Sequence, residues 1–91
     1  MRVVYAARPK PMPAELADCL REGAVVMLHS VAAAEHFRAE CERLAIDPAR
    51  IRIAAFGPRI AEAAGAGWGA VRAAERPEGG ALLALARDMC H

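Results

Sequence analysis

The sequence predicts a single α/β domain in which a parallel sheet is flanked by helices. Short runs of apolar and β-branched residues alternate along the chain with segments that carry apolar residues at helical spacing. Several of the apolar runs stop at residues that are typical of a helix start. The chain has 91 residues, which suits one small domain. Because strands that alternate with helices pair in parallel through right-handed crossovers, we expect a doubly wound sheet.

Four segments have the character of strands. The first, residues 2–7, is rich in β-branched and aromatic residues. The run at 24–30 is apolar almost throughout, which is typical of a strand buried on both faces. Residues 51–56 form a third apolar run, and residues 70–75 form a shorter and weaker one. Prolines at alternate positions in 8–13 predict an extended connection after the first strand.

Helices are expected after each of these strands, at residues 14–23, 31–46, 58–67 and 78–89. Gly23 is a suitable C-terminal stop for the first helix. Ser30 stands where the N-cap of the second belongs, and Pro58 takes the favoured first position of the third. The glycines that follow the third helix predict a C-cap and a loop: Gly65, Gly67 and Gly69. Trp68, which lies among them, is expected to cover the edge of the core.

Composition and charge exclude several classes of function. A formal net charge of +1 gives no electrostatic case for a nucleic acid or an anionic membrane as partner. No run approaches the roughly 20 apolar residues of a membrane helix, and the N-terminus lacks the layout of a signal peptide. Three widely spaced cysteines predict reduced thiols in a cytosolic, that is cytoplasmic, protein: Cys19, Cys41 and Cys90. With the histidines they complete no metal pattern, so we expect no metal site.

The corner Gly57-Pro58 follows the third predicted strand, at the sheet edge where function is expected. In open α/β sheets, ligands bind beyond the carboxyl ends of the strands. Gly57 would let the backbone turn sharply, and Pro58 presets the helical φ. The amides of Arg59 and its neighbours would then form an anion site at the helix start. The corner is equally compatible with an ordinary strand-to-helix turn, and the glycine patterns of nucleotide-binding loops are absent from it.

Other residues near predicted strand ends have both a structural and a functional interpretation. Ser30 could cap its helix alone, or cap it and also contact a ligand. Tyr5 could pack in the core with a satisfied hydroxyl, or contact a ligand from near the end of the first strand. Arg8, Arg59 and Arg76 could be simply solvated, or could converge as an anion-binding patch.

The order of segments resembles the C-terminal half of uroporphyrinogen-III synthase over nearly the whole chain. The segments that carry the resemblance are "VVYAA", "GAVVMLHSVAAAEHF", "RIRIAAFGPRIAEAAGAGWGAV" and "RPEGGALLALA". The resemblance implies a flavodoxin-like half of a protein with two α/β domains and a cleft between them. It implies an enzyme of tetrapyrrole biosynthesis that closes hydroxymethylbilane into uroporphyrinogen III, with inversion of ring D and without cofactor or metal.

The same resemblance assigns the site residues. It makes Tyr5 the catalytic residue, which assists departure of the terminal hydroxyl. It makes the following residues substrate-binding: Ser30, Gly57, Pro58, Arg59 and Ile60. Three departures from the family pattern stand in this sequence. Ile60 replaces a threonine, "GAVV" lacks an aspartate before the second strand, and "MLHS" stands in place of F-T-S.

The resemblance also implies a partner. Residues 1–13 would form the interdomain strand and linker of a domain that spans 1–91, and an N-terminal half would supply the opposing wall of the cleft. We therefore expect the 91-residue chain alone not to cyclise the bilane, and an exposed sheet edge could pair copies as a homo-oligomer. The alternative is a non-catalytic α/β binding or regulatory module. Ile60 favours this alternative, whereas Tyr5, Ser30 and the Gly57-Pro58 corner favour the enzyme.

Overall fold

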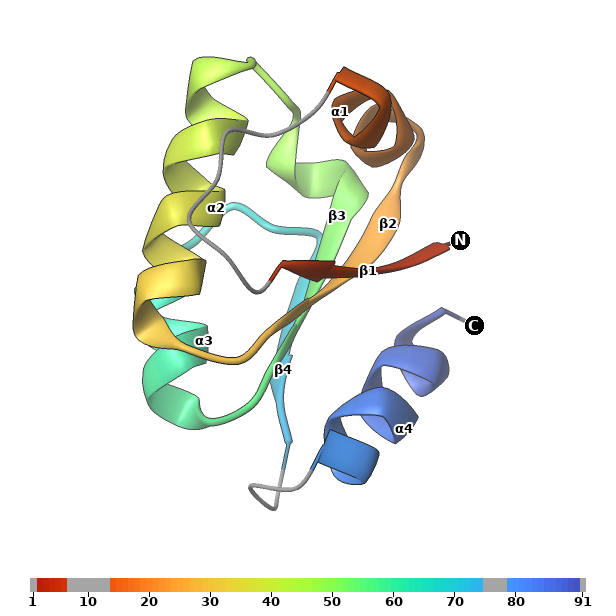
Figure 1. Cartoon of the computed structure of the whole chain (residues 1–91), viewed down its shortest axis with the longest axis vertical. Coiled ribbons are helices and arrows are strands. Elements are labelled where there is room, and N and C mark those ends of the chain that lie inside the picture. The colour runs from red at the N-terminus through yellow and green to blue at the C-terminus, as the bar shows by residue number, and fades with distance from the viewer. Residues whose placement is uncertain (1, 7–13, 75–78, 91) are drawn as a thin grey trace.

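The computed structural model describes residues 2–6, 14–74 and 79–90, and has the predicted α/β architecture (Figure 1). The elements along the chain are β1 (Arg2–Ala6), α1 (Ala14–Glu22), β2 (Ala24–Leu28), α2 (Val31–Arg43), the short 3-10 helix η1 (Pro48–Arg50), β3 (Ile51–Ala55), α3 (Pro58–Ala64), β4 (Ala70–Ala73) and α4 (Gly79–Met89). Each predicted strand and helix is present, because the apolar periodicity and the stop residues act locally.

All four strands are parallel, and they lie in the order β1-β2-β3-β4. The register aligns their last residues across the sheet: Ala6, Leu28, Ala55 and Ala73. The prediction of a doubly wound sheet is therefore wrong, because the strand order never reverses. Right-handed crossovers that all step in one direction must place their helices on one face of the sheet. β1 and β4 form the two edges.

The larger core lies between the sheet and the three crossover helices, α1, α2 and α3. It is built from alternate residues of the inner strands, since successive side chains point to opposite faces. Its members are Ala24, Val26 and Leu28 of β2; Ile51, Ile53 and Ala55 of β3; Ile46; and Ala17, Leu20, Ala34, Phe37, Cys41 and Ala64 of the helices. All are buried, so this face carries most of the hydrophobic stabilisation.

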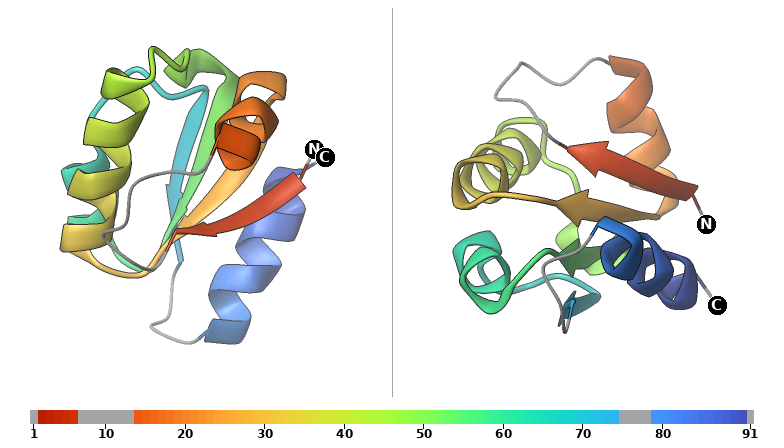
Figure 2. Two further views of the ribbon diagram at one scale, coloured as in Figure 1. Left: turned by 45° about the horizontal axis from the view of Figure 1, so that its top comes forward. Right: turned by 60° about the horizontal axis from the view of Figure 1, so that its bottom comes forward.

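The opposite face is covered by α4, which lies across the sheet from α2 and α3 (Figure 2). Val25 and Ala54, which are the intervening strand residues, pack against Leu82, Ala86 and Met89 of this helix. Because α4 does not connect two of the described strands, the crossover rule does not fix its face. Two side-chain interactions hold its end against the sheet: Arg52 donates to the carbonyl of Met89, and Arg72 pairs with Asp88.

The turns agree with most of the predicted stops. Gly23 has φ of 106°, a conformation that favours glycine, and ends α1. Gly65, with φ of 82°, is the C-cap of α3, and Gly67 has φ of 99°. The helix predicted to reach residue 46 ends earlier, at Arg43, where Ala45 takes a positive φ of 53°. The first residue predicted for the last helix, at 78, lies outside the described residues.

The loop between α3 and β4 packs closely on the rest of the chain. Trp68 is half-buried, stacks on Phe37 with ring centroids 5.6 Å apart and donates from Nε1 to the carbonyl of Ala64 at 2.9 Å. This confirms that it covers the edge of the core. The Gly69 amide lies within hydrogen-bond distance of the carbonyls of both Pro48 and Ile51. A Cβ at Gly69 would lie 2.5 Å from the carbonyl oxygen of Ala49, so only glycine fits there without a shift.

Candidate functional site

The carboxyl ends of β2 and β3 bring Ser30 and the Gly57-Pro58 corner to one edge of the sheet. β2 and β3 pair directly, and the amide of Phe56 donates to the carbonyl of Leu28 at 2.9 Å just where the strands end. Ser30 then begins α2 and Gly57 begins α3, so two helix starts lie beside each other at this edge. We call this arrangement the carboxyl-edge site.

Ser30 caps α2 as predicted. Its backbone is extended (φ −148°, ψ 159°), and its Oγ accepts a hydrogen bond from the amide of Ala33 at 3.0 Å. Its carbonyl accepts from the amide of Ala34 at 3.0 Å. Since a serine hydroxyl is also a donor, Ser30 can cap the helix through a lone pair and still present its O–H proton outward. The residue is exposed, so a ligand can reach its hydroxyl.

Gly57 is the N-cap of α3, but it does not serve as a sharp turn. Its backbone is extended (φ −163°, ψ 170°), a conformation that any residue adopts, so the predicted role of glycine in bending the chain is wrong. A Cβ built on Gly57 would meet no atom of the described residues within 4 Å. Neither backbone conformation nor packing among those residues therefore requires glycine at this position.

The first turn of α3 contains the remaining predicted binding residues. Pro58 is at the first helical position, where its fixed φ suits the helix, and it has no N–H. The amides of Ile60 and Ala61 donate to the carbonyl of Gly57 at 3.2 Å and 3.1 Å. The amide of Arg59 is therefore the first-turn donor on which an anion site would depend. The Arg59 side chain is exposed, whereas Ile60 is half-buried and packs against the larger core rather than lying wholly at the edge.

For Tyr5 the structure describes the position of the main chain. It pairs in register with Met27, one residue before the aligned strand ends, so its main chain lies at the carboxyl edge one strand away from Ser30. Its side chain lies outside the part of the chain that the structure describes. Arg8 and Arg76 lie wholly outside the described residues. The predicted patch of Arg8, Arg59 and Arg76 therefore stays a prediction at those two positions.

An aromatic pair that the sequence reasoning missed lies at the same edge. His29 and Phe56 stack with ring centroids 5.0 Å apart and an interplanar angle of 21°. Each residue directly follows the last residue of its strand, and the two strands are neighbours. The sequence signal for this contact is that each aromatic residue comes directly after a strand. That signal is useful only once β2 and β3 are known to be neighbours.

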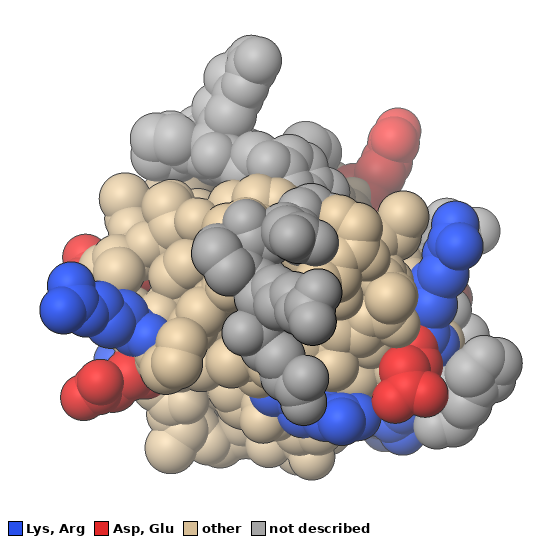
Figure 3. All heavy atoms as spheres, turned by 90° about the horizontal axis from the view of Figure 1, so that it is seen from below, with Lys and Arg blue, Asp and Glu red and all other residues tan. Residues whose placement is uncertain are grey.

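The carboxyl edge is not strongly charged over the described residues. Seen from this side, coloured acidic and basic side chains lie around the rim, while uncharged atoms occupy most of the described middle (Figure 3). Attraction of an anion to the middle of this edge would therefore rest on backbone amides and hydroxyls.

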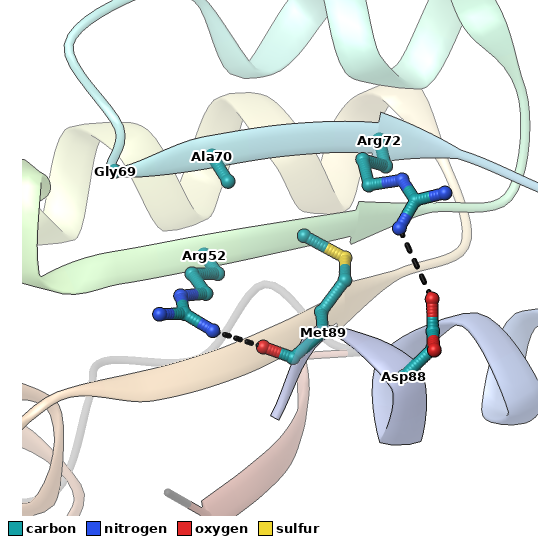
Figure 4. A pocket seen from close by; sticks show the side chains of 6 residues that line it. All are labelled: Arg52, Gly69, Ala70, Arg72, Asp88 and Met89. Carbon is teal, nitrogen blue, oxygen red and sulfur yellow. Dashed lines mark hydrogen bonds and ion pairs between the residues drawn. The ribbon is translucent and has the colours of Figure 1, made fainter. Parts of the chain in front are cut away.

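A hollow lies away from this edge, between α4 and the strands β3 and β4 (Figure 4). It has a volume of about 290 Å³ and is lined by Arg52, Gly69, Ala70, Arg72, Asp88 and Met89. Arg52, Gly69 and Ala70 lie at the starts of their strands, toward the amino end of the sheet. The sequence reasoning did not predict this hollow. The signal that could have indicated it is one arginine on each of two neighbouring strands, Arg52 on β3 and Arg72 on β4.

Two further observations on the described residues concern the thiol of Cys41 and possible metal ligands. Burial, and then the charge of Glu40, raises the pKa of the Cys41 thiol to about 12, so this thiol is protonated and packs as a small apolar group. Among residues 2–6, 14–74 and 79–90, no three His, Cys, Asp or Glu side chains are grouped to hold a metal ion. Over the same residues, every helix is too short or too polar to span a bilayer.

Comparison of the chain with protein-family models, with curated proteins and with solved structures finds no match.

Proposed function

We propose that this chain forms the C-terminal half of a uroporphyrinogen-III synthase and that the carboxyl-edge site is its wall of the substrate cleft. The observation that carries the proposal is the space at Gly57, where an added Cβ would meet no described atom, at the same sheet edge as the exposed Ser30. A glycine that neither conformation nor packing among the described residues requires is expected where a ligand lies against the main chain. The motif order across the whole chain supplies the choice of reaction.

The proposed reaction asks the protein mainly to hold a flexible linear tetrapyrrole in one arrangement, which is a proximity effect. Hydroxymethylbilane carries many carboxylates, and the helix starts at Ser30 and Gly57 offer backbone donors that suit them. The terminal hydroxyl leaves with a proton as water, and we assign the phenol of Tyr5 to assist that step. The methylene carbon left behind is attacked by the substituted carbon of ring D, and rearrangement through a spiro intermediate inverts the ring.

Two variants test the proposal in the chain fused behind the N-terminal half of a synthase of the same family. Gly57→Val fills the open space at the site, so we expect the KM for hydroxymethylbilane to rise at least about tenfold, because the ligand loses its approach to the backbone. Tyr5→Phe keeps the ring and removes the proton donor, so we expect kcat to fall about 100-fold. Formation of the inverted isomer is the readout in both cases.

Arg50→Ala is the matched control, since Arg50 is exposed in η1 at the opposite end of the sheet from the carboxyl-edge site. It is expected to leave both kinetic constants unchanged. A Gly57→Val fusion that folds and retains the original KM would show that the open backbone does not bind substrate.

The alternative is a non-catalytic binding or regulatory module. The observation in its favour is Ile60, which stands where the family has a hydroxyl and packs toward the core. A fusion that binds hydroxymethylbilane but gives no inverted product, with or without Tyr5→Phe, would support this alternative over the enzyme.

A further inference from the structure

We propose that β4 is an interface strand that pairs antiparallel with β4 of a second copy of this chain, across a two-fold axis. β4 is a terminal strand of the sheet, so this pairing would join two sheets into one of eight strands, four from each copy. The inference does not rest on the function proposed above, because it uses the side edge of the sheet and not the carboxyl ends of β2 and β3.

The backbone of β4 offers hydrogen-bonding groups on its outer side. The amide of Ala74, directly after the strand, donates to the carbonyl of Ala55 in β3 at 2.8 Å. Because successive residues of a strand turn their backbone groups to opposite sides, Val71 and Ala73 direct their N–H and C=O groups away from β3. On that side β4 pairs with no described strand. Such an edge is a template for pairing with another chain.

Val71 is the exposed apolar residue of this edge. It is 37% exposed, although its register partner Ile53 belongs to the larger core on the same face of the sheet. With the two-fold axis at Val71, the two copies of this residue lie directly opposite and exchange both N–H···O bonds of an antiparallel pair. The contact between two β-branched side chains in that position adds stabilisation.

Charge selects this register over the adjacent one. With the axis at Arg72, the two Arg72 side chains would stand directly opposite each other, and like charges in that position are destabilising. With the axis at Val71, Arg72 stands opposite Ala70 of the second copy, because each position beyond the axis faces the one equally far before it. The guanidinium groups are then separated.

The same register brings Arg72 to a carboxylate of the second copy. Ala70, Arg72 and Asp88 line one hollow on the α4 side of β4, where the other arginine, Arg52, donates to the carbonyl of Met89 (Figure 4). Asp88 Oδ2 lies 3.2 Å from Arg72 Nη1, and both side chains are largely exposed. A carboxylate has acceptor sites for more than one guanidinium. Each Asp88 can therefore accept from Arg72 of its own chain and from Arg72 of the other, so the paired edges are complementary in charge.

Sedimentation equilibrium of the 91-residue chain tests the proposal, with proline variants that block one edge at a time. We expect the parent chain to form a dimer with a Kd of about 10 μM, as suits a small interface. Val71→Pro removes the outward N–H, and proline is tolerated on an edge strand where that group faces outward. We expect this variant to raise the Kd at least about tenfold, because the central hydrogen bonds are lost.

Val3→Pro is the matched control on β1, the opposite edge strand, where Val3 is 36% exposed. The amide of Phe56 donates to the carbonyl of Leu28, so Leu28 turns its backbone groups to β3 and Val25 turns its groups to β1. Val3, the register partner of Val25, therefore directs its N–H away from the sheet. Val3→Pro should leave the Kd unchanged, and far-UV circular dichroism reports whether either proline variant has lost the fold.

Asp88→Asn tests the charge contact without altering the backbone edge. The Arg72–Asp88 pair is exposed and contributes little to stability, so the variant is expected to fold. We expect its Kd to rise several-fold, because the shared carboxylate is lost. Arg87→Ala is the control, since Arg87 is exposed on the same turn of α4 and does not line the hollow. It should leave the Kd unchanged.

Three results would overturn the proposal. The first is a parent chain that remains monomeric at about 100 μM, well above the expected Kd. The second is a dimer whose Kd is unchanged in a folded Val71→Pro or in Asp88→Asn, and Asp88→Asn decides alone if Val71→Pro does not fold. The third is a dimer that a folded Val3→Pro weakens as much as Val71→Pro does, since the copies would then pair through β1.

Discussion

Two glycines at opposite ends of the sheet, Gly69 at the amino end and Gly57 at the carboxyl end, differ in what an added side chain would meet. Gly69, at the amino end, lies against the main chain of residues 48–51 so closely that a Cβ would meet the Ala49 carbonyl oxygen at 2.5 Å. Gly57, at the carboxyl end, has extended backbone, and a Cβ there would meet no described atom within 4 Å. The same residue type is therefore required by packing at one position, whereas at the other no contact among the described residues requires it.

The largest effect is expected from Gly69→Ala. The new methyl group would overlap a backbone carbonyl, which moves only if η1 shifts, so we expect the free energy of unfolding to fall by about 3 kcal/mol. Gly80→Ala is the control: a Cβ there would meet no atom of the described residues within 4 Å, and alanine should stabilise α4 by about 0.5 kcal/mol. Urea unfolding measures both. Equal stability of the two variants would show that packing does not require glycine at position 69.

The next effect concerns Cys41, which is buried near the C-terminal end of α2. Its pKa is about 12 in the folded chain against an ordinary 9.0, so only the unfolded state releases this proton between those values. Below pH 9.0 both states hold the proton and stability is unaffected. Above it, we expect the free energy of unfolding to fall by about 1.4 kcal/mol per pH unit.

Urea unfolding between neutral pH and about pH 11 measures this slope, with variants that isolate the thiol. Cys41→Ala should lose this part of the slope, while Cys19→Ala, which retains Cys41, should keep it. If Cys41→Ala has the same slope as the parent chain, the buried thiol is not the group responsible for the slope. Water would then reach this thiol in the folded chain.

The smallest effects distinguish the N-caps of α2 and α3 at the carboxyl-edge site. Ser30→Ala removes the Oγ that accepts from Ala33, so we expect a loss of about 1 kcal/mol. Gly57→Ala replaces a cap that makes no side-chain hydrogen bond, so a change of at most about 0.5 kcal/mol is expected. Thermal unfolding of the two variants side by side gives the comparison. A large loss in Gly57→Ala would mean that the space around Gly57 is less open than its geometry indicates.

The elements could be predicted from the sequence because their signals are local. Ser30, Pro58 and Gly65 each act within one turn of the residues that they cap or stop. The strand order could not be predicted in this way, since it depends on which neighbour each crossover reaches. The sequence placed Ser30 and Gly57 at strand ends, but that they lie side by side follows only once β2 and β3 are known to pair.

Long-range features of the molecule were beyond such reasoning. The requirement for glycine at position 69 depends on the backbone of Ala49, which lies far away along the chain. The hollow with Arg52 and Arg72 exists only because α4 docks on the face opposite the other helices. A pattern read along one segment carries no information about an element that arrives later in the chain.

The uninterrupted strand order also determines how the sheet can be assembled. Arg2 pairs with Ala24, Ala24 with Ile51, and Arg52 with Ala70, so β2, β3 and β4 each pair with the strand made just before them. Pairing of consecutive strands closes smaller loops than pairing of distant strands would, so this order has a lower entropic cost of loop closure than other parallel orders of the same strands. A nascent chain could thus add one strand and one helix at a time as it leaves the ribosome. Between β1 and β4, the growing sheet never holds a gap open for a strand still to be synthesised.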